Sequence, residues 1–562
     1  MEQGFVNTCV LTIRTRCIFI SKYFVVCSFI SIFAFMKKMI LITCLLLSVA
    51  VYADDGLPIV EVKADRTIIY PQRMELNGEE TLMDVLQMVP DLLMAGYEDV
   101  ISDYNLRIDN VPVNGDERLI LTQMKAKDID KIQVCNNTGV AKGTIGTLNV
   151  LDITMKMPDK LSGFVEGQGI FGRMKEGNGT VNVLYGSKST DIYANATYRY
   201  QEGNKDYVTF HMTNRFDDRN KLLTFFTQQF IEQPYNMTRK VMGRARYFHT
   251  FNDMGTELLL VGGYQYSSDP RVSNTLPLYI VELNTPLFTK RLSMMVGNEG
   301  DYLTSTQKGR EWSWSIFNND IYLQFTYTLP QWRFTAGHRT MFYGYKLMGE
   351  GNTRKFTDTR HNTNACAIYV PNSRNQLQLG YYRKYYNPSY EILFLNTITL
   401  SYQDWLLIEG QLEEWNINQF KLGYTYSKPN FTLQTDASYY VVEGEDNYGQ
   451  VNASAYWKTG RLSLTGGAHL YFAKDKVYAT LRTAPTFYLP YQWQIGMQLV
   501  YFTKRTLQRE WLGTMMYGSL SVNKLFGRHW LVGAEWHDMF DDFLSGAVIN
   551  RHSANIKLQY RF

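Results

Sequence analysis

The feature that most limits the possible folds is an alternation of apolar and polar residues that runs to the last residue of the chain. In the final ten residues, SANIKLQYRF, every second position is apolar: Ile556, Leu558, Tyr560 and Phe562. Successive side chains of a strand point to opposite faces, so this spacing predicts a two-faced strand. Chain ends are usually polar and frayed. A strand that ends on an aromatic residue therefore needs an apolar medium beside one face.

The same pattern recurs from about Leu161 onward, with turn residues between the repeats. In 191–200, DIYANATYRY, Ile192 and Tyr198 share one face and Asn195 the other. Residues 420–440, FKLGYTYSKPNFTLQTDASYY, predict a hairpin of two nearly equal strands around the turn 427–430. In 461–474 the alternation places His469 on the polar face. The long C-terminal region is therefore predicted to be a series of antiparallel strands.

A soluble sandwich or propeller would also alternate apolar and polar residues. Three features favour a membrane barrel instead: strands of about nine to eleven residues, aromatic residues near the strand ends, and turns that alternate between short and long. Because no edge may stay unpaired in hydrocarbon, the last strand should close the barrel. We interpret 161–562 as an all-β transmembrane barrel of about 22 antiparallel strands, although 20 strands also fit the length.

The N-terminal region predicts an export signal. Residues 36–53, MKKMILITCLLLSVAVYA, combine two lysines, an apolar stretch and the small-residue cleavage site Val51-Tyr52-Ala53. The apolar segment 17–35 further upstream could instead be a membrane anchor. We expect Met36 to be the start and 1–53 to be an upstream segment and signal peptide. The remaining chain should then lie in the outer membrane of a Gram-negative bacterium.

Charge and cysteine content exclude several classes of protein. Residues 1–53 hold five basic residues and one acidic residue, which leaves 52 of the 57 basic and 52 of the 53 acidic residues in the rest. Without a basic surplus we expect no nucleic-acid partner. Only Cys135 and Cys366 lie beyond residue 53, and neither has the spacing of a metal site. The eight histidines form no catalytic or metal-binding motif, so we expect no enzyme, no cofactor and no metal.

Residues 54–160 have a mixed pattern that predicts a compact α+β domain. Leu82, Val85, Leu86 and Val89 form a helical stripe that ends at Pro90. Short strands are expected at 106–108, 118–121 and 131–134, and a longer one over 144–156. Such a domain could lie in the periplasm or inside the barrel lumen.

Four segments of this domain resemble the plug domain of TonB-dependent outer-membrane receptors. They are TLMDVLQMVPDLL, LRIDNVPVNG, DIDKIQV and GTIGTLNVLDITMK, in the order that the family has. The chain resembles the short receptors of Bacteroidetes-type bacteria most. It departs from the family pattern at Asn110, where glycine is usual, and at Gln133, where an acid is usual. Asparagine tolerates the left-handed backbone of such a turn.

The resemblance implies that 54–160 is a plug inside the lumen and that a ligand contacts its outward loops. The implied ligand-binding residues are Tyr97, Tyr104, Asn114, Asp116 and Arg118. The resemblance also implies an energy-coupling segment near the start of the plug, and 57–63, LPIVEVK, is the candidate. The implied TonB contacts are Leu57, Pro58, Ile59, Val60, Glu61, Val62 and Lys63. This segment would add a strand to TonB through backbone hydrogen bonds, but it also fits the first strand of the plug.

The implied function is energy-coupled uptake of a small ligand, such as a siderophore or another scarce nutrient. The implied partners are the TonB complex of the inner membrane, outer-membrane lipid, the barrel assembly machinery and a ligand that the sequence does not identify. The alternative is a plugged barrel that does not transport and acts as a surface adhesin or assembly partner.

Overall fold

The computed structural model describes residues 57–562 apart from short gaps. These gaps are 64–65, 75–79, 81, 83–84, 87–103, 109–110, 113–123, 136–148, 157–160, 172–174, 201–203, 234–235, 271, 309–312, 350–351, 387–414, 444–446, 474–475, 504, 508–509, 513–514, 528 and 538–552. The predicted signal peptide and upstream segment lie outside the described residues. None of the helices in this part of the chain is long and apolar enough to span a membrane.

The first sheet is small and mixed, and it forms the plug. Its strands are β1 (Val60–Val62), β2 (Thr67–Ile69), β3 (Tyr104–Ile108), β4 (Val111–Pro112), β5 (Ile129–Cys135) and β6 (Asn149–Met155), with short 3-10 helices at Pro71–Arg73 and Ala126–Asp128. The strand order is β1-β2-β5-β6-β3-β4, and only β3 and β6 are parallel. Leu82, Val85 and Leu86 are helical and buried, as the apolar stripe predicted.

The second sheet is a closed barrel of 22 strands. Its first half comprises β7 (Ser162–Phe171), β8 (Lys175–Gly186), β9 (Thr190–Tyr200), β10 (Asn204–Arg215), β11 (Asn220–Gln233), β12 (Asn236–Thr250), β13 (Glu257–Ser268), β14 (Val272–Leu287), β15 (Thr289–Gln307), β16 (Ser313–Thr328) and β17 (Trp332–Gly349). The second half comprises β18 (Asn352–Asn372), β19 (Asn375–Tyr386), β20 (Trp415–Lys428), β21 (Phe431–Val442), β22 (Tyr448–Thr459), β23 (Leu462–Ala473), β24 (Lys476–Leu489), β25 (Trp493–Phe502), β28 (Met515–Phe526), β29 (Trp530–His537) and β30 (Ser553–Arg561).

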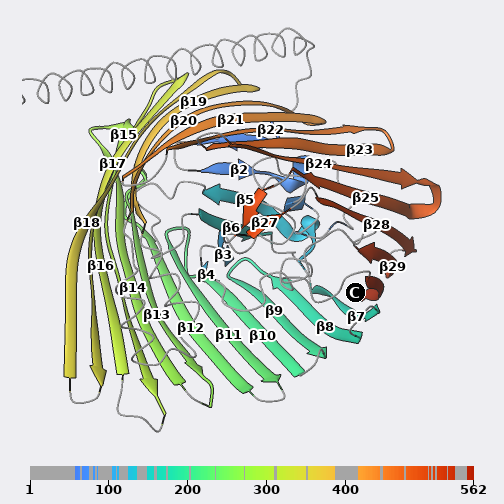
Figure 1. The fold of residues 1–562 in the computed structure, drawn as a ribbon, viewed down its shortest axis with the longest axis horizontal. Helices are drawn as coiled ribbons and strands as arrows, with labels where there is room; N and C mark the ends of the chain where they lie inside the picture. Colours follow the sequence, from blue (N-terminus) through green and yellow to red (C-terminus); the bar gives the residue numbers. More distant parts are fainter. Residues whose placement is uncertain are drawn as a thin grey trace, which may run out of the picture. The chain divides into compact units, whose positions relative to one another are not determined.

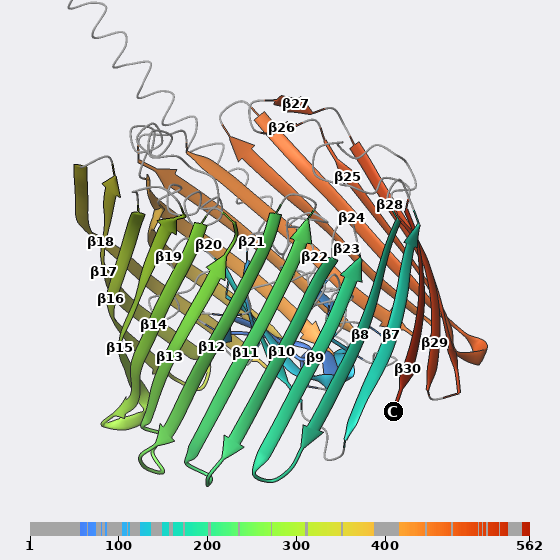
Figure 2. The same ribbon diagram turned by 90° about the horizontal axis from the view of Figure 1, so that it is seen from below.

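All neighbouring strands of the barrel are antiparallel, which confirms the predicted fold and the larger of the two predicted strand counts. A short two-stranded sheet, β26 (Arg505–Leu507) with β27 (Glu510–Leu512), lies in the connection after β25, and a 3-10 turn at Pro490–Gln492 precedes β25. Figure 2 shows the C-terminus at the end of the barrel opposite β26 and β27. We call the end with the C-terminus and the short turns periplasmic, and the opposite end outer.

The last strand closes the barrel as predicted, because β30 pairs with β7. Phe562 and Gly163 exchange two backbone hydrogen bonds of 3.1 Å. A Cβ at Gly163 would lie 2.1 Å from the carbonyl oxygen of Asn182, so this closing position needs glycine. On β30, Leu558 is 49% exposed to the outside, whereas Gln559 is fully buried inside. The alternation therefore sorts apolar side chains toward lipid and polar side chains toward the lumen.

Aromatic residues mark the periplasmic end of the wall. Trp332, Trp493 and Trp530 are the first residues of β17, β25 and β29, and all three are exposed on the lipid-facing side of the wall. Indole rings favour the boundary between lipid and water, which fits a membrane edge at this height.

The plug lies inside the lumen (Figure 1). Its buried core includes Ile69, Leu106 and Ile132, and this core is continuous with buried wall residues such as Phe225 and Tyr456. Plug and wall therefore share one apolar core, and the plug blocks the part of the lumen that it fills.

Candidate functional site

The segment 57–63 forms the first strand of the plug and lies at the edge of its sheet. β1 pairs with β2 through Val60–Ile69 and Val62–Thr67. Leu57 is exposed, whereas Ile59, Val60 and Val62 are buried. An edge strand normally leaves one row of backbone groups unpaired. The structural question is what satisfies the open side of β1.

The barrel wall supplies the partners for that open side. The amide of Val60 donates to Oγ of Ser427 at 3.1 Å, and the amide of Val62 donates to Oε1 of Gln376 at 2.5 Å. Both acceptors lie near the periplasmic ends of β20 and β19. The Val62 side chain packs against Cys366 and Ile368 of β18. Three neighbouring wall strands therefore hold β1.

Polar side chains complete the attachment of β1. Glu61 accepts a hydrogen bond from the Tyr70 hydroxyl at 3.2 Å and lies 3.5 Å from the Arg333 guanidinium of β17. Burial raises the pKa of the Tyr70 phenol, and the negative charge of Glu61 adds to this shift. Arg73 stacks on the Tyr70 ring and donates to the Pro58 carbonyl oxygen at 2.8 Å. These contacts are partly exposed, so each adds little free energy by itself.

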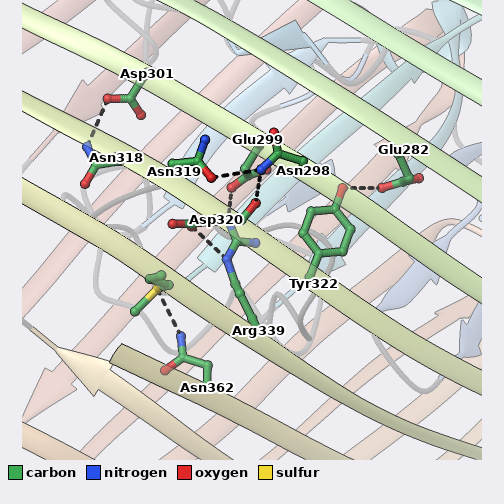
Figure 3. Close-up of polar contacts among 11 residues, drawn as sticks. Glu282, Asn298, Glu299, Asp301, Asn318, Asn319, Asp320, Tyr322, Arg339 and Asn362 are labelled. Atoms are coloured by element: carbon green, nitrogen blue, oxygen red, sulfur yellow. Dashed lines mark hydrogen bonds and ion pairs between the residues drawn. The ribbon is translucent and has the colours of Figure 1, made fainter. Parts of the chain in front are cut away.

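A second group of polar residues lies on the lumen face of β14 to β17 (Figure 3). We call it the wall cluster. Arg339 is 1% exposed, makes ion pairs with Asp320 and Glu299, and donates from Nε to Asp320 at 2.8 Å. Two further pairs belong to the cluster, namely Asn318 to Asp301 at 3.0 Å and Tyr322 to Glu282 at 2.8 Å.

The wall cluster faces a charge of the plug. Arg107 of β3 is buried and lies within electrostatic reach of Arg244, Tyr322 and Arg339. Buried charges are tolerated where opposite charges and hydrogen bonds compensate for lost hydration. Glu299 and Asp320 provide that compensation for Arg339, and Asp301 lies within electrostatic reach of Arg244.

Two tyrosines connect other parts of the plug to the wall. The Tyr456 hydroxyl donates to the carbonyl oxygen of Met74 at 2.9 Å, and the Tyr488 hydroxyl donates to Glu80 at 3.1 Å. Glu80 is 1% exposed. The plug is therefore held by single polar contacts distributed around the wall, in addition to the shared apolar core.

Gln133, at the position where the resembled family usually has an acid, bridges two charged groups. Its Oε1 accepts from Arg66 at 2.7 Å, and its Nε2 donates to Asp152 at 3.3 Å. A carboxylate there could accept from Arg66 but could not donate to the buried Asp152. The amide therefore suits this environment better than the usual acid.

Most of the ligand-binding residues implied by the sequence resemblance cannot be placed. Tyr97, Asn114, Asp116 and Arg118 lie outside the described residues, and Tyr104 begins β3 beside Asn149 of β6. Their contact with a ligand stays a prediction.

Among the described residues, no group of three or more histidine, cysteine or acidic side chains is arranged to hold a metal ion.

The wall residues that hold β1 were not predicted from the sequence. The alternation places Gln376 on a lumen-facing position, but many glutamines and serines share that property. Nothing in the local sequence identifies the plug residue that each one meets.

Comparison of the fold with solved structures decides its class. The siderophore receptor PirA from Pseudomonas aeruginosa superposes with a TM-score of 0.66 at 12% identity, covering 89% of this chain and all of that one. The ferric citrate transporter FecA gives a TM-score of 0.66 at 12% identity, covering 90% and 98%. The ferric-catecholate import receptor Fiu from E. coli K12 gives a TM-score of 0.64 at 12% identity, covering 90% and 97%.

This chain has the plug-and-barrel fold of the TonB-dependent siderophore receptors. The receptor fold agrees with the sequence resemblance, and its 22-strand barrel is like those of Gram-negative outer-membrane receptors. No protein-family model and no curated protein matches the sequence. At 12% identity the similarity establishes the fold, and the residues that bind a ligand must be argued from this chain itself.

Proposed function

We propose that the protein is a TonB-dependent transporter that takes up a small ligand, such as a siderophore or another scarce nutrient, across the outer membrane. The observation that carries the proposal is the position of 57–63 as an edge strand of a plug that fills the barrel. The known proteins of this fold include import receptors and transporters for iron complexes.

The mechanism requires that β1 can leave its place without unfolding the barrel. β1 has three residues, and its outer edge is held by the side chains of Ser427 and Gln376 rather than by a strand. Each such hydrogen bond contributes roughly 0.5–1.5 kcal/mol net. TonB would replace these bonds by pairing its own sheet with 57–63 and would then pull the segment toward the periplasm.

The remaining partners follow from the surfaces of the barrel. Outer-membrane lipid would contact the apolar outer face, and the barrel assembly machinery would recognise the C-terminal strand that ends at Phe562. The small ligand would contact the outward side of the plug, where Tyr97, Tyr104, Asn114, Asp116 and Arg118 are the expected contacts. No nucleic acid is expected.

A plugged barrel without transport activity is the second candidate. The burial of Ile59, Val60 and Val62 favours it, because a static plug has no need to release β1. Such a protein would present its outer loops as an adhesin or assembly partner.

A thiol lock on β1 tests the transport mechanism. Val62→Cys places a thiol beside the native Cys366, with which Val62 packs. Oxidation or a short bifunctional thiol reagent should then fix β1 to β18. The matched control carries Val62→Cys together with Cys366→Ala, so that it has the same change in β1 but no wall thiol.

The readout is binding of the purified C-terminal domain of TonB from the same bacterium. We expect wild type and the control to bind TonB under all conditions. The Val62→Cys variant should bind only while its two thiols are not crosslinked, and after oxidation a reductant should restore binding. Binding that is unaffected by the lock would exclude 57–63 as the TonB contact. A wild type that never binds TonB would favour the static barrel.

A further inference from the structure

Four tyrosines form a row on adjacent strands near the outer end of the barrel. The row runs through Tyr440 on β21, Tyr448 on β22, Tyr471 on β23 and Tyr478 on β24. Successive ring centroids are 4.4, 5.3 and 5.9 Å apart, with interplanar angles of 12°, 31° and 33°. We call this row the tyrosine ladder.

The ladder faces the lumen. Its strand neighbours Tyr439 and Val477 are exposed on the lipid-facing surface, so Tyr440 and Tyr478 point inward. The same alternation places Tyr448 and Tyr471 inward, because Trp457 of β22 and Leu464 of β23 are exposed outside.

The ladder lies on the outer side of the contact between plug and wall. Farther toward the periplasm on the same strands, Tyr456 of β22 and Tyr488 of β24 contact the plug and are buried. The four ladder residues are only half-buried. A ligand that enters from outside would therefore meet the ladder before it meets the deeper wall.

Hydrogen-bonding side chains surround the ladder. The Tyr440 hydroxyl accepts from Gln419 at 3.1 Å and lies 3.5 Å from Oε1 of Gln450. In the next row toward the periplasm, Asn452 pairs across the strands with both Asp436 and His469. Asn452 donates to the Asp436 carboxylate at 3.2 Å.

Two buried atoms of this second row lack a partner. Among the described residues, neither Oδ1 of Asn452 nor Nε2 of His469 has a hydrogen bond. Buried polar atoms are rarely left without a partner, so a ligand or ordered water is expected to fill this role.

The charges near the ladder do not suit an anionic ligand. Three charged residues lie at the level of these rows: Asp436, Lys421, which pairs with Ser438, and Lys476, which pairs with Ala473 next to Tyr448. By sequence, the connections 387–414, 443–447 and 474–475, which join β19 to β20, β21 to β22 and β23 to β24, contain nine acidic residues and one lysine. This net negative charge by sequence disfavours a strongly anionic iron chelate as the ligand.

We propose that the tyrosine ladder and the row of Asp436, Asn452 and His469 bind an uncharged, polyhydroxylated ligand, that is, a sugar or oligosaccharide. Phenol, amide and carboxylate groups together offer donors and acceptors for hydroxyl groups, and the aromatic rings offer apolar surface to the C–H groups of a sugar. This inference rests on the proposed uptake function and names the ligand class for it.

The test uses the purified full-length protein in detergent and an array of neutral oligosaccharides. Two variants probe the ladder. Tyr448→Phe with Tyr471→Phe keeps the rings and removes two hydroxyls, whereas Tyr448→Ala with Tyr471→Ala also removes the rings. The matched control is Tyr439→Phe, which removes a hydroxyl from the lipid-facing neighbour of Tyr440.

We expect wild type and the Tyr439→Phe control to bind at least one neutral oligosaccharide with equal affinity. The double phenylalanine variant should bind it about tenfold more weakly, because two hydrogen bonds are lost. The double alanine variant should not bind detectably while keeping its heat-modifiable mobility on gels. This mobility shows that the barrel is still folded.

Three results would overturn the inference: no neutral oligosaccharide is bound, binding does not depend on the ladder, or ferric citrate binds in a ladder-dependent way instead. These results leave the TonB-binding experiment untouched. A protein that binds TonB through 57–63 but binds no oligosaccharide would keep the transport function and lose the ligand class. A protein that binds oligosaccharides but never binds TonB would keep the ligand class and lose the transport function.

Discussion

The backbone amide of Val62 donates a hydrogen bond to Oε1 of Gln376 across 2.5 Å. The two residues are 314 positions apart in the sequence, and they join the first strand of the plug to the barrel wall. An edge strand inside a closed barrel cannot pair with another strand, so a wall side chain takes that role. The same bond must break before β1 can pair with any other protein.

Removing both wall acceptors should loosen β1. In a variant with Gln376→Ala and Ser427→Ala, the amides of Val60 and Val62 lose their partners, at a cost of roughly 1–3 kcal/mol for each buried group. Hydrogen exchange at these two amides should become faster by at least tenfold. Gln229→Ala on β11, which removes a buried glutamine from a distant part of the wall, should leave the exchange unchanged. Equal protection in all variants would mean that these bonds do not hold β1.

The two arginines of β17 should differ in their effect on stability. Arg339→Ala leaves the buried carboxylates of Asp320 and Glu299 without their cation and should lower the free energy of unfolding by about 3–5 kcal/mol. Arg333→Ala removes a half-exposed pair with Glu61 and should cost less than about 1 kcal/mol. Urea unfolding in detergent would compare them. Similar losses in both variants would contradict the assigned role of the wall cluster.

Gly297 is expected to tolerate no side chain. A Cβ there would lie 2.3 Å from Cζ of Tyr322, whose hydroxyl donates to Glu282 in the wall cluster. Gly297→Ala should therefore displace the tyrosine ring and destabilise the barrel by about 1–3 kcal/mol. Gly262→Ala on β13 is the matched control, because a Cβ there meets no atom within 4 Å. The prediction fails if the two variants unfold at the same urea concentration.

Asp128 should make the plug less stable as the pH rises. Burial raises the pKa of its carboxyl above the ordinary 3.8, although Lys127, Lys125, Arg561 and Lys156 act in the opposite direction. The folded protein thus holds this proton more tightly than the unfolded chain, and stability falls as pH rises from 3.8 through the raised pKa.

Asp128→Asn removes this penalty. Amides of β5 and β6 should be better protected from hydrogen exchange in the variant at pH 7, relative to wild type. The difference should disappear well below pH 3.8, where the aspartate is protonated in both states. A benefit that does not change with pH would point to packing rather than to charge.

The architecture could be predicted from the sequence because it depends on local periodicity. The alternation in 191–200, 420–440 and 553–562 assigned each side chain to lipid or lumen, and the register of β9, β20, β21 and β30 agrees with it. The terminal phenylalanine predicted a closing strand, and β30 closes the barrel on β7. The helical stripe of Leu82, Val85 and Leu86 likewise marked a buried helix.

The sequence by itself therefore determined which residues face outward and which face inward, because a strand repeats every two residues regardless of its neighbours. Only the tertiary structure decided that Gln376 and Ser427 meet β1, that Arg339 joins Glu299 and Asp320, and that four tyrosines align. These contacts depend on the register between strands and on the orientation of the plug in the lumen. The packing of the whole barrel fixes this register and this orientation, so neither can be predicted from a local stretch of sequence.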